Sequence, residues 1–229
     1  MPAKSTPNRP PATAPEFRRR LLRWFRRHGR DLPWRRTRDP YAVLVSEFML
    51  QQTQVSRVEV YWPRFLERFP TVGALAKARP AAVRESWEGL GYYRRAANLH
   101  ALARKVTSEQ AGAIPSDTAS LRGLPGVGRY TAGAVASFAF ERAEPAVDTN
   151  VARVLRRAFH PRARGTAGEH KLWQTAAALH TRHGHSAWAF NQAIMELGAL
   201  ICTARIAKCG ECPVQRVCKT GKRGLKTKN

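Results

Sequence analysis

Apolar residues recur along most of this sequence at intervals of three and four, the spacing of an α-helix that buries one face. The first such segment covers 16–28, where Phe17, Leu21 and Phe25 share a face and arginines fill most of the other positions. Gly29 follows as a stop signal. The pattern predicts a basic amphipathic helix, which could lie on DNA or on an acidic membrane.

The same periodicity predicts helices over the remainder of the chain. Asp39 before Pro40 is typical of an N-cap with proline at the first helical position, and predicts a helix to about Thr53. We expect Pro63 to break or restart the helical pattern between 55 and 69. No segment alternates as a strand would, so the predicted fold is all-α. The other predicted helices cover 71–78, 80–88, 92–109, 148–159, 168–183 and 186–201.

A glycine-rich segment at 124–131, Leu-Pro-Gly-Val-Gly-Arg-Tyr-Thr, separates two of these helical patterns. Gly126 and Gly128 lack a Cβ, so the turn can adopt positive φ and approach a partner closely. Backbone amides at the start of a helix can bind phosphate. The segment therefore predicts a helix–hairpin–helix at about 117–140 that contacts the DNA backbone. An ordinary corner between two helices remains the alternative.

The chain is strongly basic. It has 40 Lys and Arg against 16 Asp and Glu, a net charge of +24, with 43% hydrophobic residues. This excess indicates a polyanionic partner, although a passive basic protein would show it too. No apolar run is long enough to span a membrane, and the N-terminus lacks the apolar core of a secretory signal.

Both ends of the sequence look different from the helical middle. Residues 1–15 are rich in proline and show no apolar periodicity, so they predict a disordered tail. Residues 219–229 carry basic residues and no acid, and predict a flexible basic tail.

Four cysteines lie close together near the C-terminal end, with the spacing C-x6-C-x2-C-x5-C. Such a cluster in an otherwise cysteine-free chain indicates a metal site in a reducing compartment. The spacing alone leaves zinc and an iron–sulfur cluster open. The predicted ligands are Cys202, Cys209, Cys212 and Cys218.

Glu47 lies within an apolar helical segment. Its neighbours at helical spacing are Val43, Leu44, Leu50 and Gln51. A carboxyl group on such a face is partly desolvated and holds its proton more tightly, which suits a catalytic acid near neutral pH. The alternative is a surface glutamate whose side chain reaches water.

Two uncharged polar and aromatic turns complete the candidate chemistry. They are 51–53 (Gln-Gln-Thr) and 89–93 (Gly-Leu-Gly-Tyr-Tyr). In a DNA-binding protein such residues suit base contacts and insertion into a base stack. Capping and core packing would explain them equally well.

Together these stretches resemble the helix–hairpin–helix DNA glycosylases of the endonuclease III superfamily, and most of all the MutY-type adenine DNA glycosylases. The resemblance runs in order from about Phe17 to Cys218. The segments that carry it are 32–35, 46–55, 87–93, 124–132, 147–151, 191–198 and the cysteine loop.

The resemblance implies a fold of two α-helical lobes. One is a six-helix lobe at 40–147, and the other joins 16–39 to 148–218 and holds a [4Fe-4S] cluster rather than zinc. It also implies a monomer that binds double-stranded DNA and flips a mispaired base out of the stack. The implied location is the bacterial cytoplasm at the nucleoid, or another intracellular compartment that contains DNA.

The resemblance also implies catalytic roles. Glu47 matches the acid/base that protonates the departing adenine at N7, and Asp148 matches the carboxylate that stabilises positive charge at the sugar C1′. Tyr130 and Asn150 match supporting residues. The residues implied to line the adenine pocket or to contact DNA are Trp34, Arg35, Gln51, Gln52, Thr53, Leu90, Tyr92, Gly126, Gly128, Arg129 and Glu196.

The implied reaction is removal of adenine opposite guanine or 8-oxoguanine by water. Relatives that also cleave the strand have a lysine amine where this chain has Tyr130. A thymine glycosylase acting on G/T or G/U mismatches is the alternative, and a catalytically silent DNA-binding relative is a third. The presence of both Glu47 and Asp148 favours an enzyme. MutY-type proteins usually carry a further C-terminal domain that inspects 8-oxoguanine, so we expect a weaker preference for that base here.

Overall fold

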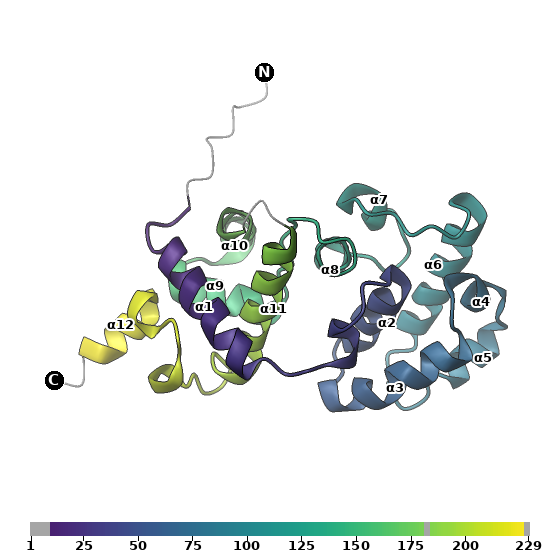
Figure 1. Cartoon of the computed structure of the whole chain (residues 1–229), viewed down its shortest axis with the longest axis horizontal. Coiled ribbons are helices and arrows are strands. Elements are labelled where there is room, and N and C mark those ends of the chain that lie inside the picture. The colour runs from purple at the N-terminus through teal and green to yellow at the C-terminus, as the bar shows by residue number, and fades with distance from the viewer. Residues whose placement is uncertain (1–9, 181–183, 227–229) are drawn as a thin grey trace, which may run out of the picture. The chain divides into compact units, whose positions relative to one another are not determined.

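The computed structural model describes residues 10–180 and 184–226, and all regular elements in these ranges are helices (Figure 1). The predicted all-α class is confirmed. The chain divides into two compact units. The middle unit comprises Asp31–Glu141, and the terminal unit combines residues up to Arg30 with those from Arg142 onward.

The middle unit is built around α2 (Pro40–Leu50), in which every residue from Tyr41 to Met49 is buried. The sequence Tyr-Ala-Val-Leu-Val-Ser-Glu-Phe-Met is apolar on nearly all sides, so the helix lies inside the unit and packs against α3, α6 and α8. The other helices are η1 (Pro33–Arg35), α3 (Val55–Arg68), α4 (Val72–Lys77), α5 (Pro80–Glu85), α6 (Arg94–Glu109), α7 (Thr118–Arg122) and α8 (Arg129–Phe138).

In the terminal unit, the two ends of the described chain share one core. Phe17 and Leu21 of the first helix are fully buried with Leu155, Phe190 and Leu197 from later helices. The helices are α1 (Ala14–His28), α9 (Thr149–Phe159), α10 (Gly165–Leu179), α11 (Gly184–Leu200), η2 (Cys209–Glu211), η3 (Gln215–Val217) and α12 (Lys219–Lys226).

The unit boundaries differ from those expected. The middle unit begins at Asp31 rather than at 40, because η1 packs on α2, and it ends at Glu141 rather than at 147. Residues 142–147 belong to the terminal unit, where Asn191 binds the backbone of Glu144 and Ala146.

Two expectations for the tails need correction. The first helix begins at Ala14, so residues 14 and 15 are helical, while residues 1–9 lie outside the described residues. The basic segment 219–226 forms α12 instead of a flexible tail. Thr220 ties it to the core by donating to the backbone oxygen of Arg157 over 2.8 Å. Residues 227–229 lie outside the described residues.

Pro63 does not break the helical pattern, contrary to expectation. It lies inside α3, which continues from Val55 to Arg68. Proline removes one backbone donor and leaves the carbonyl four residues earlier without its helical partner. That carbonyl belongs to Glu59, an exposed residue, so water can satisfy it.

The predicted helix start at Asp39 is confirmed, and the predicted helix–hairpin–helix begins at a second capping residue, Asp117. Asp39 accepts from the amides of Tyr41 (3.0 Å) and Ala42 (3.3 Å) at the start of α2. Asp117 accepts from the amide of Ser120 at the start of α7 over 2.8 Å. Side-chain capping of this kind fixes where each helix begins.

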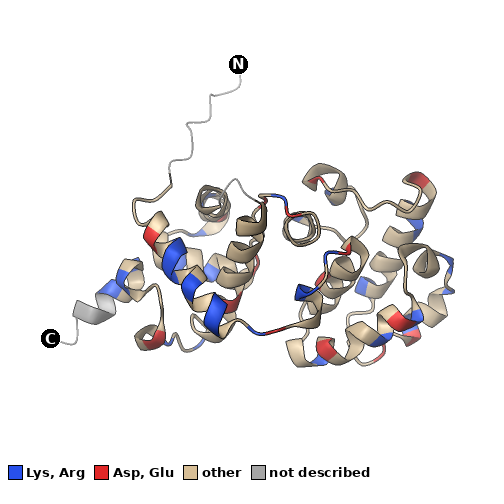
Figure 2. Ribbon diagram, viewed as in Figure 1, with Lys and Arg blue, Asp and Glu red and all other residues tan. Residues whose placement is uncertain are grey.

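Basic residues recur along α1, as Figure 2 shows, and Arg19, Arg23, Arg26 and Arg27 are exposed. Its buried residues are Ala14, Phe17 and Leu21, while Arg26, Arg27 and His28 occupy its last turn. Arg residues near a helix C-terminus are stabilised by the helix dipole. Among the described helices, none is sufficiently long and apolar to cross a membrane.

Candidate active site

Glu47 lies inside the middle unit, with 4% of its surface exposed. It is on α2, one residue after Ser46, whose hydroxyl donates back to the oxygen of Val43 over 2.7 Å. The alternative of a glutamate solvated at the surface is therefore wrong. Burial disfavours the charged form of a carboxyl group, which suits an acid that must deliver a proton.

Asp148 is the N-cap of α9 in the terminal unit. Its Oδ1 accepts from the amide of Val151 over 2.7 Å, and its Oδ2 accepts from Nδ2 of Asn150 over 2.9 Å. Burial raises the pKa of Asp148 above its usual value, while these hydrogen bonds and the charge of Arg153 oppose the increase. The position at a helix start was predicted; the upward direction of the pKa was not, because burial outweighs the cap.

Arg153 connects the Asp148 carboxylate to the cysteine loop. One turn along α9, its guanidinium donates to Oδ1 of Asn150 and to the oxygen of Gly198, both over 2.7 Å. Its Nε donates to the oxygen of Cys202, also over 2.7 Å. Sequence reasoning missed Arg153. The only available signal was its helical spacing of three from Asn150.

Glu196 on α11 is paired with an arginine that sequence reasoning did not select. Arg30 donates to it from its backbone nitrogen (3.0 Å), from Nε (2.7 Å) and from Nη2 (3.1 Å). Glu196 is 1% exposed, so the pair satisfies a charge that would otherwise be costly to bury. The sequence predicted only that Glu196 contacts adenine, whereas the structure shows that it also pairs with Arg30.

The hairpin between α7 and α8 requires one of its two glycines for conformational reasons. Gly126 has φ +77°, and a Cβ there would lie 2.8 Å from both Phe48 and Asn98 side-chain atoms. Gly128 has an ordinary φ of −86°, so the expectation of positive φ is wrong for this residue. A Cβ on Gly128 would meet open space, which leaves its backbone accessible to a partner at the start of α8.

Arg129 and Tyr130 form the first turn of α8, which follows Gly128 directly. Arg129 is exposed and Tyr130 is partly buried. The predicted helix–hairpin–helix is thus formed by α7, the turn and α8, with a positively charged side chain at the helix start.

The two polar turns each contain a non-glycine residue with an unusual backbone conformation. Gln52 (φ 58°) and Tyr92 (φ 47°) both have left-handed backbone conformations, which non-glycine residues rarely adopt. Tyr92 is 63% exposed, whereas Leu90 is 5% exposed. Leu90 therefore packs in the core, and the predicted insertion of Leu90 into DNA would require it to leave that position. Gln51 and Thr53 are partly buried beside Gln52.

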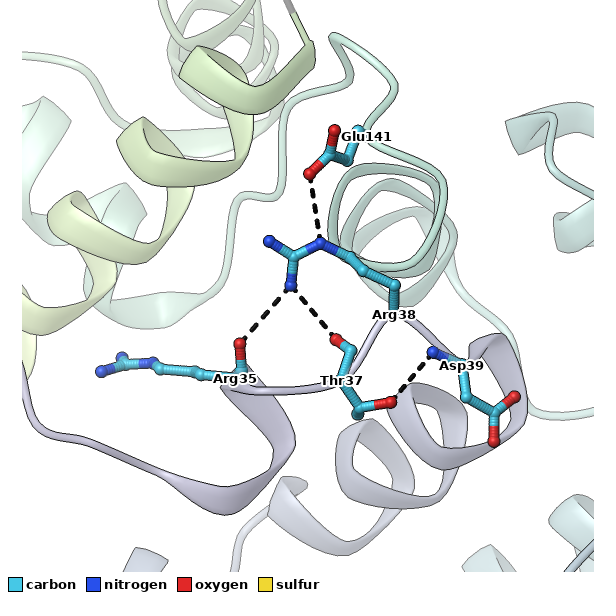
Figure 3. Close-up of polar contacts among 5 residues, drawn as sticks. All are labelled: Arg35, Thr37, Arg38, Asp39 and Glu141. Atoms are coloured by element: carbon cyan, nitrogen blue, oxygen red, sulfur yellow. Dashed lines mark hydrogen bonds and ion pairs between the residues drawn. The ribbon is translucent and has the colours of Figure 1, made fainter.

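Trp34 and Arg35 belong to η1 at the start of the middle unit. Trp34 is 7% exposed, and its ring lies 6.2 Å from that of Trp62. Figure 3 shows how Arg38 fixes the following loop: it donates to the oxygens of Arg35 (3.4 Å) and Thr37 (3.1 Å), and to Glu141 (3.2 Å). The loop that presents Arg35 is thereby attached to the end of α8.

Residues 45–176 match the model of the HhH-GPD superfamily of base excision DNA repair proteins. The chain belongs to this superfamily. The predicted family and helix–hairpin–helix fold are thus confirmed.

Within this superfamily, the chain is similar to several adenine DNA glycosylases. It is 49% identical over 195 residues to that of Mycolicibacterium smegmatis, covering 85% of this chain and 66% of the relative. It is 46% identical over 220 residues to that of Homo sapiens, covering 90% of this chain and 40% of the relative. The chain thus spans about two thirds or less of the length of these relatives.

Solved structures of the superfamily share its architecture. A thermostable thymine-DNA glycosylase has a TM-score of 0.85 and 30% identity, covering 92% of this chain and 97% of that one. Endonuclease III in a non-covalent complex with DNA has a TM-score of 0.78 and 24% identity, covering 93% and 96%. The second likeness establishes the fold alone.

The cysteine loop of this HhH-GPD chain follows α11 and folds around η2 and η3. Arg157 contacts the sulfur of Cys202 through Nη1, and the amide of Gly221 contacts the sulfur of Cys218, both over 3.3 Å. Burial, followed by the neighbouring thiols, raises the pKa of Cys212 to about 12. Within 10–180 and 184–226, no group of three or more His, Cys, Asp or Glu side chains forms a site that could hold a metal ion.

The predicted site residues divide between the two units. The middle unit carries Glu47, the hairpin, the two polar turns, Trp34 and Arg35, whereas the terminal unit carries Asp148, Asn150, Glu196 and the cysteines. Each unit therefore contributes one carboxylate of the predicted catalytic pair.

Proposed function

We propose that this chain is a monofunctional DNA glycosylase that removes adenine mispaired with guanine or 8-oxoguanine. The observation that supports it most is the contrast between its two carboxyl groups. Glu47 is buried in an apolar helix, and Asp148 is held by an amide and by Asn150 at a helix start. The relatives that are 46–49% identical to this chain are adenine DNA glycosylases.

In the proposed reaction, Glu47 donates its proton to N7 of adenine. The bond between the sugar C1′ and N9 breaks, and adenine departs with the bonding electrons. The ionised Asp148 stabilises the positive charge left on the sugar, as carboxylates do in glycoside hydrolysis. Water then adds to C1′ and releases a proton. Tyr130 cannot form a Schiff base, so base removal ends the reaction.

Adenine selection is proposed to depend on Glu196, with Trp34 and Arg35 lining the pocket. Arg30 keeps Glu196 ionised through its bidentate contact, and an ionised carboxylate is the form that accepts from the N6 amino group of adenine. Thymine has no exocyclic amine, so it would leave this acceptor without that donor. The resulting discrimination is on the order of ten- to hundredfold.

We propose that double-stranded DNA with a mispaired base is bound by the hairpin and the polar turns. The accessible amide of Gly128 and the exposed Arg129 suit phosphate, while Gln52 and Tyr92 suit the base stack. The net charge of +24 supports affinity for the backbone. The protein is proposed to act as a monomer.

The cysteine loop is proposed to hold a [4Fe-4S] cluster on Cys202, Cys209, Cys212 and Cys218. Four thiols on one short loop are the donor set for such a cluster. The N–H groups that reach the sulfurs of Cys202 and Cys218 fit thiolate ligands, whose charge hydrogen bonds stabilise. When bound, the cluster would order the loop that carries the four cysteines.

A thymine glycosylase is the second candidate, because the thermostable thymine-DNA glycosylase has a TM-score of 0.85 and the chain covers 97% of it. Single-turnover excision should be measured on A·G, A·8-oxoguanine and T·G duplexes side by side. We expect both adenine substrates to react faster than T·G. Faster excision from T·G would replace adenine by thymine as the substrate, and no excision from any duplex would leave a DNA-binding protein without this activity.

A further inference from the structure

Arg95, in the first turn of α6, is a buried cation that binds two separate loops. It is 7% exposed. The Gln loop (residues 51–54) follows α2, and the Tyr loop (residues 86–93) precedes α6. In sequence, Arg95 is more than forty positions from its partners at the end of α2, so the contact depends entirely on the fold.

One guanidinium group bonds both loops. Nη1 faces the end of α2 and the Gln loop. Its two N–H groups are shared among four acceptors, the oxygens of Phe48 (3.1 Å), Met49 (2.8 Å) and Gln51 and the hydroxyl of Thr53 (3.1 Å). Nη2 donates to the Tyr loop, to the oxygens of Leu90 and Gly91, each over 3.0 Å. The backbones of the two loops therefore lie side by side across this group.

Both loops contain a strained residue at the point where they are exposed. Gln52 and Tyr92 have φ values of 58° and 47°, and each lies next to a residue whose carbonyl Arg95 binds. A left-handed conformation at such a residue is unfavourable and persists only where its surroundings enforce it. Arg95 also lies 5.6 Å from the Tyr92 ring, beneath an otherwise exposed side chain.

We infer that Arg95 is a positioning residue, which holds Gln52 and Tyr92 together in a rigid wedge for insertion into the DNA base stack. Separating stacked bases is unfavourable, and a wedge that is already ordered loses little conformational entropy when it inserts. The inference rests on the proposed function, because the wedge serves to extrude the base that is then excised. Arg95 itself does not touch the reacting atoms.

Arginine suits this position better than lysine. Its planar fork can donate in two directions at once, towards the Gln loop and the Tyr loop, and it stays charged even though burial lowers its pKa. A lysine ammonium is a single point of charge and would hold one loop or the other. Arg95→Lys therefore keeps the buried charge and removes the simultaneous contact.

The test compares two substrates that differ only in the work of opening the duplex. One contains adenine opposite guanine, and the other contains the same adenine in a bubble of unpaired bases. The variants are Arg95→Lys and Arg95→Met. Arg104→Met removes a charge from an exposed position on the same helix and is the matched control. Circular dichroism and thermal unfolding identify any variant that does not fold, and Arg95→Lys carries the test if Arg95→Met fails.

Arg95→Lys is expected to slow single-turnover excision from the A·G duplex about tenfold, and from the bubble less than about threefold. It should also reduce the fluorescence increase of a duplex that contains 2-aminopurine as the target base, since that signal reports unstacking. Arg104→Met should leave both measurements at wild-type levels. Equal slowing on the two substrates, or no slowing on either, would overturn the wedge.

Failure of the proposed function would give a different result. The unaltered protein would then excise no base from either substrate. The 2-aminopurine measurement needs no chemistry, so it still decides whether Arg95 controls base unstacking. If the unaltered protein increases the fluorescence and Arg95→Lys does not, the result would support the wedge without supporting base excision. The same increase with both proteins would contradict it.

Discussion

Asn150 donates a hydrogen bond to Oδ2 of Asp148 over 2.9 Å, and its own side-chain oxygen accepts from Arg153 over 2.7 Å. Arg153 fixes which end of the amide faces Asp148, because a guanidinium can only donate. The carboxylate therefore faces an N–H group rather than a second oxygen. This hydrogen bond favours the ionised form of Asp148 and partly offsets its burial, which on balance raises the pKa of the carboxyl group.

Replacing either carboxyl group should abolish most base excision but preserve DNA binding. We expect Glu47→Gln and Asp148→Asn each to reduce the single-turnover rate on A·G duplex at least about a hundredfold, as for loss of a catalytic acid or of charge stabilisation. Phosphate contacts supply most of the affinity, so Kd should change little. Rates and fluorescence anisotropy on one duplex provide the check, and full activity in either variant would refute its assigned role.

The rate of excision should fall at acidic pH because Asp148 must be ionised. Burial raises its pKa, so protonation begins at a higher pH than for an exposed aspartate, and activity is lost as pH falls through that value. Asn150→Ala removes a hydrogen bond that lowers this pKa, so the acid limb should move to higher pH. A pH profile of single-turnover rates measures both effects. An unmoved limb in Asn150→Ala would show that another group sets it.

Arg30→Met should destabilise the fold by leaving the Glu196 carboxylate buried without its cation. Breaking a buried pair on one side costs roughly 3 kcal/mol, less where one partner is partly exposed, as Arg30 is. The double variant Arg30→Met/Glu196→Gln removes both charges and should recover part of this loss. Urea unfolding gives the three free energies of unfolding. A double variant less stable than Arg30→Met would show that charge burial is not the cause.

The two hairpin glycines should respond differently to alanine. Gly126→Ala combines φ +77° with contacts of 2.8 Å, so it should lower the free energy of unfolding by more than about 1 kcal/mol. Gly128→Ala meets open space and should leave stability unchanged, yet it should weaken DNA binding because its methyl group lies where phosphate would approach. Thermal unfolding and DNA anisotropy on both variants separate the two roles.

Anaerobically purified protein should be brown and contain about four irons per chain. Replacing Cys212 by serine should reduce both the colour and the affinity for DNA, because the loop from Cys202 to Cys218 would lose its order. Iron analysis and visible absorption provide the measurement. A colourless protein with one stoichiometric zinc would contradict the cluster.

Local chemistry was predictable from the sequence, whereas partners distant in the chain were not. The caps at Asp39, Asp117 and Asp148 need only a few neighbouring residues, so their positions could be read directly. The bonds from Arg30 to Glu196 and from Arg95 to the Gln loop join residues far apart in sequence. Their basic side chains look like any others in a chain of 40 Lys and Arg.

The burial of individual turn residues was equally hidden. Leu90 and Tyr92 occur in one short motif, but the first packs in the core and the second is exposed. Their difference depends on the left-handed backbone at Gly89, Gly91 and Tyr92, which turns successive side chains in unrelated directions. Likewise, Pro63 is tolerated because the carbonyl that loses its helical partner belongs to an exposed residue, Glu59. No local sequence pattern reveals that exposure.

The two oxygens of Asp148 are held from different directions, Oδ1 by the amide of Val151 and Oδ2 by Asn150. The carboxylate consequently cannot rotate about its Cβ–Cγ bond without losing a helix cap or an amide contact. Such a group needs no reorganisation as charge develops near it. Since this carboxylate is fixed in orientation, the sugar of the extruded nucleotide must adopt one position relative to it. Discrimination between substrates then depends on how closely each extruded nucleotide reaches that position.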